Sequence, residues 1–256
     1  MKILFLGDIV GKPGRDIVFK HLSQLQELEQ IDFTIVNAEN SAHGKGITTK
    51  IYNQLIDAGV DVITMGNHTY SKGEIKSHME DFPEMVVPYN HLIQLHQGYK
   101  IYDVNGLKLC VCNLVGSALM YENNQDIFSS MRDILSETKA DLYFVDLHAE
   151  ATSEKILFAQ YFKNDLIAVV GTHTHVQTAD ERIMGNLAYI SDVGMCGVYE
   201  SVIGRDIDEM IANIIEGEMT KYTVASGEAV LCACVIEIDD ETKKAIDIKR
   251  IQIRPY

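Results

Sequence analysis

Strand-like and helix-like segments alternate through most of this sequence, and this alternation is the feature that most constrains the fold. Short apolar runs rich in β-branched residues indicate buried strands, whereas apolar residues recurring every three or four positions indicate helices. Repeated strand–helix units are typical of an α/β domain. The expected strands are 2–7, 32–36, 60–65, 141–147, 166–170 and 186–190, and the expected helices are 17–28, 49–58, 126–138, 155–162 and 206–218.

Two further pairs of segments are expected to form antiparallel strands. Asn105-Gly106, the strongest short hairpin signal, lies between 99–104 and 107–114. The chain closes with the alternating segments 229–238 and 245–253, joined by a charged turn. No repeat or linker divides the sequence, so we predict a single domain over residues 1–256.

The charge balance limits the classes of partner. The formal net charge is −15, which argues against the broad phosphate-binding surface of a nucleic-acid binder. A nucleotide or RNA end held by metal ions stays compatible, because bound dications reverse the local field. No apolar run reaches the roughly 18–20 residues that span a bilayer, and the first apolar run is interrupted by Asp8. We therefore predict a cytoplasmic protein that is not attached to a membrane.

The five cysteines are interpreted as buried apolar residues. Their odd number in a cytoplasmic chain indicates free thiols. Two C-x-C pairs could be metal ligands, but both lie in apolar strand-like runs, where residues i and i+2 share one face. Small buried hydrophobes are the more common role of such residues. The cysteines are Cys110, Cys112, Cys196, Cys232 and Cys234.

Five of the expected strands end in side chains that can bind a metal ion or transfer a proton. In α/β sheets, ligands bind outside the carboxyl ends of the strands, so these side chains can meet in one volume. The set combines carboxylates, amides and imidazoles without a thiolate, which suits manganese, iron or zinc. It is too large for one tetrahedral site and fits two ions about 3.5–4 Å apart that share a bridging carboxylate. The residues are Asp8, Glu39, Asn40, Asn67, His68, His148, His173 and His175.

Each part of this set is weak evidence when taken alone. His173 and His175, separated by one residue, could equally lie on an exposed turn. A lone aspartate after a strand, such as Asp8, often caps a helix. Gly171 allows a close backbone approach next to the histidine pair. The prediction therefore depends on the co-occurrence of such residues at successive strand ends.

The same blocks, taken in order, resemble the motifs of calcineurin-like metallophosphoesterases. They are most similar to the YmdB-like branch, a bacterial group linked to 2′,3′-cyclic nucleotide phosphodiesterase activity. The resemblance covers nearly the whole chain and implies a four-layer α/β/β/α sandwich with two mixed sheets. The matching stretches are Gly7-Asp8, 37–40, Gly66-Asn67-His68, 147–150 and 171–175, together with 8–15, 176–180 and 189–197.

The sequence departs from the general superfamily at several positions. The usual Asp-x-His start has no histidine here, since Val10 stands at the third place. Glu39 occupies the position of the usual bridging aspartate. Both departures are typical of the YmdB-like branch. That branch often has tryptophan at the position of Tyr70, and this chain has no tryptophan, which leaves the substrate preference there open.

The resemblance implies specific roles for the strand-end residues. The cofactor would be two divalent or mixed-valent metal ions, with iron or manganese favoured and zinc as the alternative. Glu39 would bridge them, and His68 would act as general acid toward the leaving alkoxide. Asp8, Glu39, Asn40 and His175 would hold the first ion, and Glu39, Asn67, His148 and His173 the second.

The implied activity is hydrolysis of small phosphodiesters, with 2′,3′-cyclic nucleotides as substrates, by metal-hydroxide attack. His43 and Lys45, in the loop after two presumed ligands, are candidates for substrate binding, and Glu150 is a candidate to orient His148. A link to RNA ends or RNA turnover and a homo-oligomer are also expected from the resemblance. His78, His91 and His96 are predicted to be surface residues.

Two other function classes are compatible with the sequence. A regulatory protein could use the metal site to bind nucleotide or RNA ends with little catalysis. A different metallohydrolase, such as an amidase, could use a similar ligand set. Retained metal and tight nucleotide binding without turnover would favour the first, and a substrate panel would identify the second.

Overall fold

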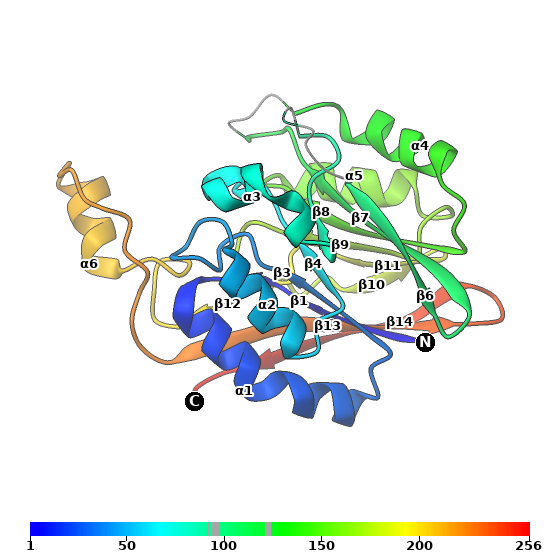
Figure 1. Ribbon diagram of the computed structural model, residues 1–256, viewed down its shortest axis with the longest axis horizontal. Helices are drawn as coiled ribbons and strands as arrows, with labels where there is room; N and C mark the ends of the chain where they lie inside the picture. Colours follow the sequence, from blue (N-terminus) through cyan, green and yellow to red (C-terminus); the bar gives the residue numbers. More distant parts are fainter. Residues whose placement is uncertain (92, 94–97, 121–123) are drawn as a thin grey trace.

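Two mixed β-sheets lie face to face in the computed structural model, which describes residues 1–91, 93, 98–120 and 124–256 (Figure 1). The first sheet has the order β2 (Asp8–Ile9), β12 (Met195–Val198), β13 (Ala229–Asp239), β1 (Lys2–Leu6), β3 (Phe33–Asn37), β4 (Val62–Thr64) and β5 (Met85–Val86), with β14 (Lys244–Ile253) paired to β13. The second has the order β10 (Arg182–Met184), β11 (Leu187–Ile190), β9 (Ala168–Thr172), β8 (Leu142–His148), β7 (Leu107–Val115) and β6 (Tyr99–Val104).

Helices cover the outer face of each sheet. Helices α1 (Gly11–Glu29) and α2 (Thr49–Asp57) pack on the first sheet, and α4 (Ile127–Glu137) and α5 (Thr152–Tyr161) pack on the second (Figure 1). Short helical segments, namely Thr69–Ser71, α3 (Gly73–Ser77) and Met79–Asp81, follow β4. Helix α6 (Ile207–Met210) continues into a π-helical turn, Ile211–Ile215. The predicted four-layer α/β/β/α sandwich is therefore confirmed.

Alternation along the strands explains the layers. In β1, Ile3 and Phe5 join the apolar cluster between the two sheets, whereas Leu4 and Leu6 join the cluster under α1 and α2. Successive side chains of a strand point to opposite faces, so a strand that is apolar on both faces needs cover on both. The rings of Phe5 and Phe144 stack across the sheets with centroids 5.7 Å apart.

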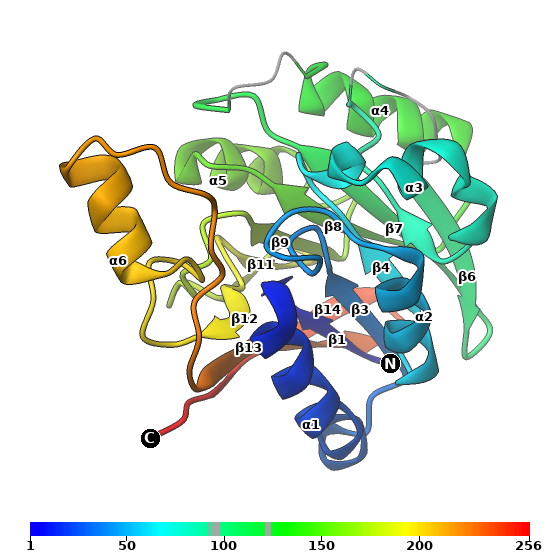
Figure 2. The same cartoon turned by 60° about the vertical axis from the view of Figure 1, so that its left-hand side comes forward.

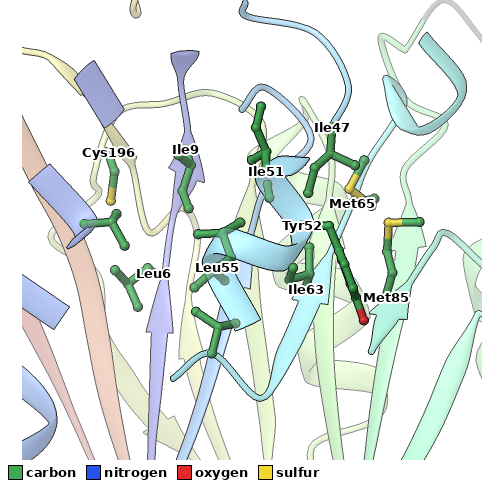
Figure 3. Packing of buried hydrophobic residues seen from close by; sticks show 14 of the residues in the cluster. Leu6, Ile9, Ile47, Ile51, Tyr52, Leu55, Ile63, Met65, Met85 and Cys196 are labelled. Atoms are coloured by element: carbon green, nitrogen blue, oxygen red, sulfur yellow. The ribbon is translucent and has the colours of Figure 1, made fainter. Parts of the chain in front are cut away.

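Helix α2 shows how the outer layer is built. The Thr48 side chain accepts a hydrogen bond from the Ile51 amide and caps the helix. Ile51, Tyr52 and Leu55 share the face that turns toward β3 and β4 (Figure 3). Burying that face against the sheet fixes the helix directly beside the loop 38–48, which carries candidate site residues.

Most of the predicted segments are found within a few residues of their expected bounds, and all five cysteines are buried and free, as predicted. The helix predicted over 206–218 is present but shorter than expected, since α6 is followed by a π-helical turn that ends at Ile215. Strands β2, β5, β10 and β12 were not predicted, since each has four residues or fewer. None of the helices in the described ranges is both long and apolar enough for a bilayer crossing.

One segment stands off the body of the molecule. Residues 199–228, here called the arm, connect β12 to β13 and carry α6 (Figure 2). The apolar residues that the sequence places on one helical face are exposed, including Ile214 and Ile215. The arm begins and ends at the sheet, where the Tyr199 amide donates a hydrogen bond to the Glu228 carbonyl (2.9 Å).

Candidate metal centre

The carboxyl ends of parallel strands in both sheets bring distant residues together. Strands β1, β3 and β4 run parallel in one sheet, as do β8 and β9 in the other. His148 Nε2 lies 3.1 Å from both Glu39 Oε1 and Asn67 Oδ1, and 3.0 Å from His173 Nδ1. Ligand atoms of Glu39, His148 and His173 all lie within 4.8 Å of one another. Four residues from four strand ends thus surround one point.

A second group adjoins the first. Asp8 is fully buried, and its Oδ1 lies 3.8 Å from His175 Nε2. Asn40 donates from Nδ2 to the Gly44 carbonyl (3.1 Å), which fixes the orientation of the amide. Within the described part of the chain, Asp8 Oδ1 and Asn40 Oδ1 are buried without a hydrogen-bond partner. Unsatisfied buried oxygens of this kind are costly unless something outside the protein chain compensates them.

Hydrogen bonds fix the tautomers of two site histidines. The Thr172 hydroxyl donates its only proton to Asp146 Oδ1 (2.7 Å), so it must accept from His148 Nδ1 (2.9 Å). His175 Nδ1 lies 2.8 Å from the Ile203 carbonyl, which can only accept. Both Nδ1 atoms therefore carry protons, and both Nε2 atoms face the candidate site.

His173 is held in the same manner, except that its Nε2 faces outward and its Nδ1 faces inward. His173 Nε2 lies 3.3 Å from Glu150 Oε2, which leaves Nδ1 facing His148. The prediction that Glu150 orients His148 is wrong, because Thr172 occupies that position and Glu150 contacts His173 instead. All three imidazoles thus have an acceptor at the outer nitrogen and turn the inner nitrogen toward the candidate site, the orientation found at metal-binding histidines.

The buried charges perturb one another strongly. Burial raises the pKa of Asp8 to about 6, although His175 and His148 oppose this. Burial alone would lower the pKa of His148, but the carboxylates of Glu39 and Asp8 raise it to about 9. Burial and His148 lower the pKa of His173 to about 3. Protons and metal ions compete for the same ligand atoms, so metal binding at this cluster would depend on pH.

The loop that carries His173 and His175 is strained and firmly held. Both residues have positive φ angles, 100° and 66°, which are unfavourable for side chains other than glycine. The buried Asp192 carboxylate accepts from the Thr174 amide and from Lys155 Nζ, each at 3.0 Å. This network holds the loop in a conformation that it would not adopt alone, and it aims both imidazoles inward.

Three buried residues with supporting roles were missed by the sequence interpretation: Asp146, Lys155 and Asp192. Asp146 accepts hydrogen bonds from Asn37 Nδ2 (2.9 Å) and Thr64 Oγ1 (2.6 Å), and so links the two sheets below the site. Two of them could have been noticed in the sequence, since Asp146 is a carboxylate inside an apolar strand and Lys155 is a lysine in the predicted helix 155–162.

Two glycines permit the close packing around the site. A Cβ on Gly66 would lie 2.3 Å from Glu39 Oε2 and 2.5 Å from His148, so any side chain would displace those groups. A Cβ on Gly171 would lie 1.8 Å from the Ser191 carbonyl oxygen. The close backbone approach predicted at Gly171 is therefore confirmed.

A hollow of about 290 Å³ opens over these residues. His68 lines it, and its backbone amide donates to Glu39 Oε2 (2.9 Å). Burial lowers the pKa of His68, which makes its protonated form a stronger acid. The lining residues are Glu39, Asn40, Gly44, His68, Glu150, His173, Thr174, His175, Ile203, Arg205 and Tyr222.

The two predicted substrate-binding residues have different positions. Lys45 is exposed, and its amine lies 5.7 Å from the centre of the Tyr222 ring at the edge of the hollow. His43 lines a separate hollow with Arg15 and Phe19, so the structure does not bring it to the candidate site. The loop turns at His43, where φ is +56°.

Three further histidines were predicted to lie at the surface. His78 is exposed, as predicted. The surface position predicted for His91 is wrong, because only 8% of the residue is exposed and its ring packs against Tyr70 with centroids 5.1 Å apart. His96 lies outside the described residues.

Comparison with known proteins identifies the family. A family model described as "YmdB-like protein" matches residues 4–251. The chain belongs to the YmdB-like family. A Bacillus subtilis relative named 2′,3′-cyclic-nucleotide 2′-phosphodiesterase is 45% identical over 256 residues, which cover 99% of this YmdB-like chain and 97% of the relative.

Solved structures agree with this assignment. A crystal structure described as a novel phosphatase from Mycoplasma pneumoniae has a TM-score of 0.94 and 38% identity, covering 99% of this chain and 93% of that one. A hypothetical protein from Thermus thermophilus has a TM-score of 0.92 and 33% identity, with 99% of both chains covered. The predictions of the family, of the fold and of a hydrolase acting on phosphoesters are confirmed.

The residues of this YmdB-like protein fit the metal ions that the family implies. The donors are oxygens and imidazole nitrogens, which suit divalent transition metals. Two of the oxygens are buried and unsatisfied, three imidazoles turn a ring nitrogen inward, and a glycine leaves the space that a side chain would fill.

We expect Thr172→Val to weaken metal binding to this YmdB-like protein by roughly 10–100-fold, the range seen when a partner of a ligating histidine is removed. Valine cannot accept from His148 Nδ1, so the ring is free to protonate Nε2. Titration of Mn²⁺ into metal-free protein by calorimetry measures the change. Thr172→Ser keeps the hydroxyl and is the matched control; equal affinity in the valine and serine variants would contradict the tautomer assignment.

Proposed function

We propose that this protein is a metal-dependent phosphodiesterase that hydrolyses small phosphodiesters, with 2′,3′-cyclic nucleotides as the substrate class. The observation that carries the proposal is the convergence of two oriented imidazoles, those of His148 and His173, on the buried Glu39 carboxylate. The name of the 45% identical Bacillus subtilis relative supports the choice of substrate. A hollow open to solvent above the cluster gives a phosphate ester access.

The candidate ligands divide into two sets that share Glu39. Asp8, Asn40 and His175 complete the first set, and Asn67, His148 and His173 complete the second. Bound divalent ions would offset the charge on the phosphoryl oxygens and make water a better nucleophile near neutral pH. The protein supplies the spacing of the two sets through strand ends that come from different sheets.

His68 is the proposed general acid. Its backbone is fixed by the hydrogen bond to Glu39, and its side chain lines the hollow. A phosphoryl group at the base of the hollow would have its leaving oxygen beside this imidazole, which can donate a proton as the ester bond breaks. Lys45 at the edge adds positive charge near the incoming phosphate.

Elemental analysis of the purified protein, paired with turnover of 2′,3′-cyclic AMP, tests the proposal. We expect about two transition-metal ions per chain, hydrolysis of the cyclic diester, and loss of activity on chelation that added Mn²⁺ restores. A protein that retains its metal and binds the nucleotide tightly without hydrolysing it would instead favour a regulatory binding role. Turnover that survives complete metal removal would refute the proposal.

A further inference from the structure

The arm contributes a wall to the candidate site. Ile203, Arg205 and Tyr222 all belong to residues 199–228, and all three line the hollow. The other lining residues come from the loops at the strand ends. The arm, which projects from the body of the molecule in Figure 2, therefore contributes side chains to this hollow from outside the sandwich.

Arg205 is held rigidly within the arm. Its Nη2 donates to both oxygens of Glu209 (2.7 and 2.8 Å), and its Nε donates to Oε2 (3.2 Å). Thr220 donates a further hydrogen bond to the same carboxylate. The guanidinium carbon lies 4.8 Å from the centre of the Tyr222 ring. Glu209 already neutralises the charge of Arg205. A ligand could therefore contact Arg205 mainly through the plane of the guanidinium group and through the remaining Nη1 donor.

Tyr222 is fixed from the opposite side by the loop after β3. A Cβ on Gly44 would lie 2.2 Å from Tyr222 Cε1, so the ring edge packs directly against the glycine backbone. Burial raises the pKa of Tyr222, although the neighbouring Arg205 opposes this rise. The ring is half-buried and is held between the arm and the backbone of Gly44.

The base of the arm is anchored to the same loops. The Ile203 carbonyl accepts from His175 Nδ1 (2.8 Å), and within the arm the Ala225 amide donates to the Gly204 carbonyl (2.9 Å). A Cβ on Gly204 would lie 2.6 Å from a methyl group of Val10, which shows how closely the arm packs on the start of α1. The arm residues that line the hollow are therefore held at a fixed distance from the proposed metal ligands.

We propose that Tyr222 and Arg205 form the subsite for the nucleobase of a nucleoside cyclic phosphate, a proposal that rests on the proposed function. The phosphate must lie against the ligand atoms at the base of the hollow, so the base projects toward its mouth. Phenol rings and guanidinium planes are surfaces on which bases stack. Stacking also gives affinity without a basic patch, which suits a chain of net charge −15.

The test compares a substrate that has a base with one that lacks it. We use 2′,3′-cyclic AMP and the 2′,3′-cyclic phosphate of methyl riboside, with the metal-loaded enzyme. Tyr222→Leu removes the aromatic plane while keeping an apolar side chain. We expect it to raise KM for cyclic AMP roughly ten-fold, as loss of one stacked base predicts, and to leave KM for the baseless substrate unchanged. Tyr222→Phe should behave like the unmodified protein.

Arg205→Lys provides an independent check, because lysine keeps the charge but lacks the plane and the fork that binds Glu209. It should raise KM for cyclic AMP selectively as well. Lys221→Ala, an exposed neighbour in the arm, is the control and should change neither KM. Thermal melting confirms that each variant is folded.

The outcomes separate the two proposals. Equal KM changes on both substrates, or no change in Tyr222→Leu, would overturn the nucleobase subsite while leaving the phosphodiesterase intact. Absence of turnover by the unmodified protein on either substrate would overturn the proposed function itself, and the subsite with it.

Discussion

Glu39→Gln should lower the affinity for metal by more than about 100-fold and abolish detectable phosphodiesterase activity. Loss of a residue that only orients a ligand costs roughly 10–100-fold, and Glu39 is placed to contact both proposed ions directly. Its carboxylate is 1% exposed and lies 3.1 Å from His148 Nε2. Glutamine keeps the shape of the side chain but removes the charge that the cluster of imidazoles and carboxylates requires.

Calorimetric titration with Mn²⁺ and elemental analysis measure this loss, and circular dichroism confirms that the variant is folded. Glu241→Gln removes a carboxylate from the exposed turn between β13 and β14 and is the matched control. Two bound ions in Glu39→Gln would show that Glu39 does not bridge. If that variant does not fold, Asn40→Ala tests the first set of ligands separately.

His68→Ala should reduce kcat on 2′,3′-cyclic AMP by roughly 10²–10⁴-fold, the contribution usual for a positioned general acid. The metal content should not change, because the hydrogen bond from residue 68 to Glu39 comes from the backbone amide, which alanine retains. Turnover and elemental analysis on the same preparation separate a role in proton donation from a role in metal binding.

The choice of leaving group sharpens this experiment. Bis(p-nitrophenyl) phosphate releases a phenolate that leaves without protonation, so His68→Ala should affect it much less than the nucleotide, which releases an alkoxide. His78→Ala, at an exposed position, is the control and should match the unmodified protein. An equal loss on both substrates would remove His68 from the role of general acid.

The sequence predicts an α/β domain and the approximate place of the site because both depend on local patterns, whereas the two-sheet sandwich was expected from the family resemblance. Apolar alternation marks strands such as β1, and polar residues directly after a strand mark the carboxyl edge of the sheet. Asp8 Oδ1 and His175 Nε2 lie 3.8 Å apart, so strand ends that are far apart in the sequence do meet at this edge. The metal-binding roles of these residues stay predictions.

The partners of the site histidines could not be predicted, because they depend on contacts between elements. Glu150 follows His148 closely in sequence, yet the chain turns so that its carboxylate meets His173. Thr172 contacts His148 because β8 and β9 pair in parallel register. Such contacts are set by register and loop direction, which short sequence motifs do not encode.

The arm was missed for a related reason. The sequence pattern of apolar residues at helical spacing does not distinguish a helix that packs on the body from one that projects from it. In residues 206–218 these apolar side chains are largely exposed. Arg205 and Tyr222 are separated by 17 positions and belong to no recognised motif. Only the three-dimensional path of the chain brings them to the hollow.

Strands β12 and β13 pair directly with each other at the base of the arm, through Val198 opposite Ala229 and Gly197 opposite Val230. The arm is therefore a long excursion within what is otherwise a hairpin, and the sheet continues across its two ends. Because the two strands stay paired on either side of this insertion, a change in the length of residues 199–228 would leave the register of β12 and β13 intact and would alter only the wall of the hollow.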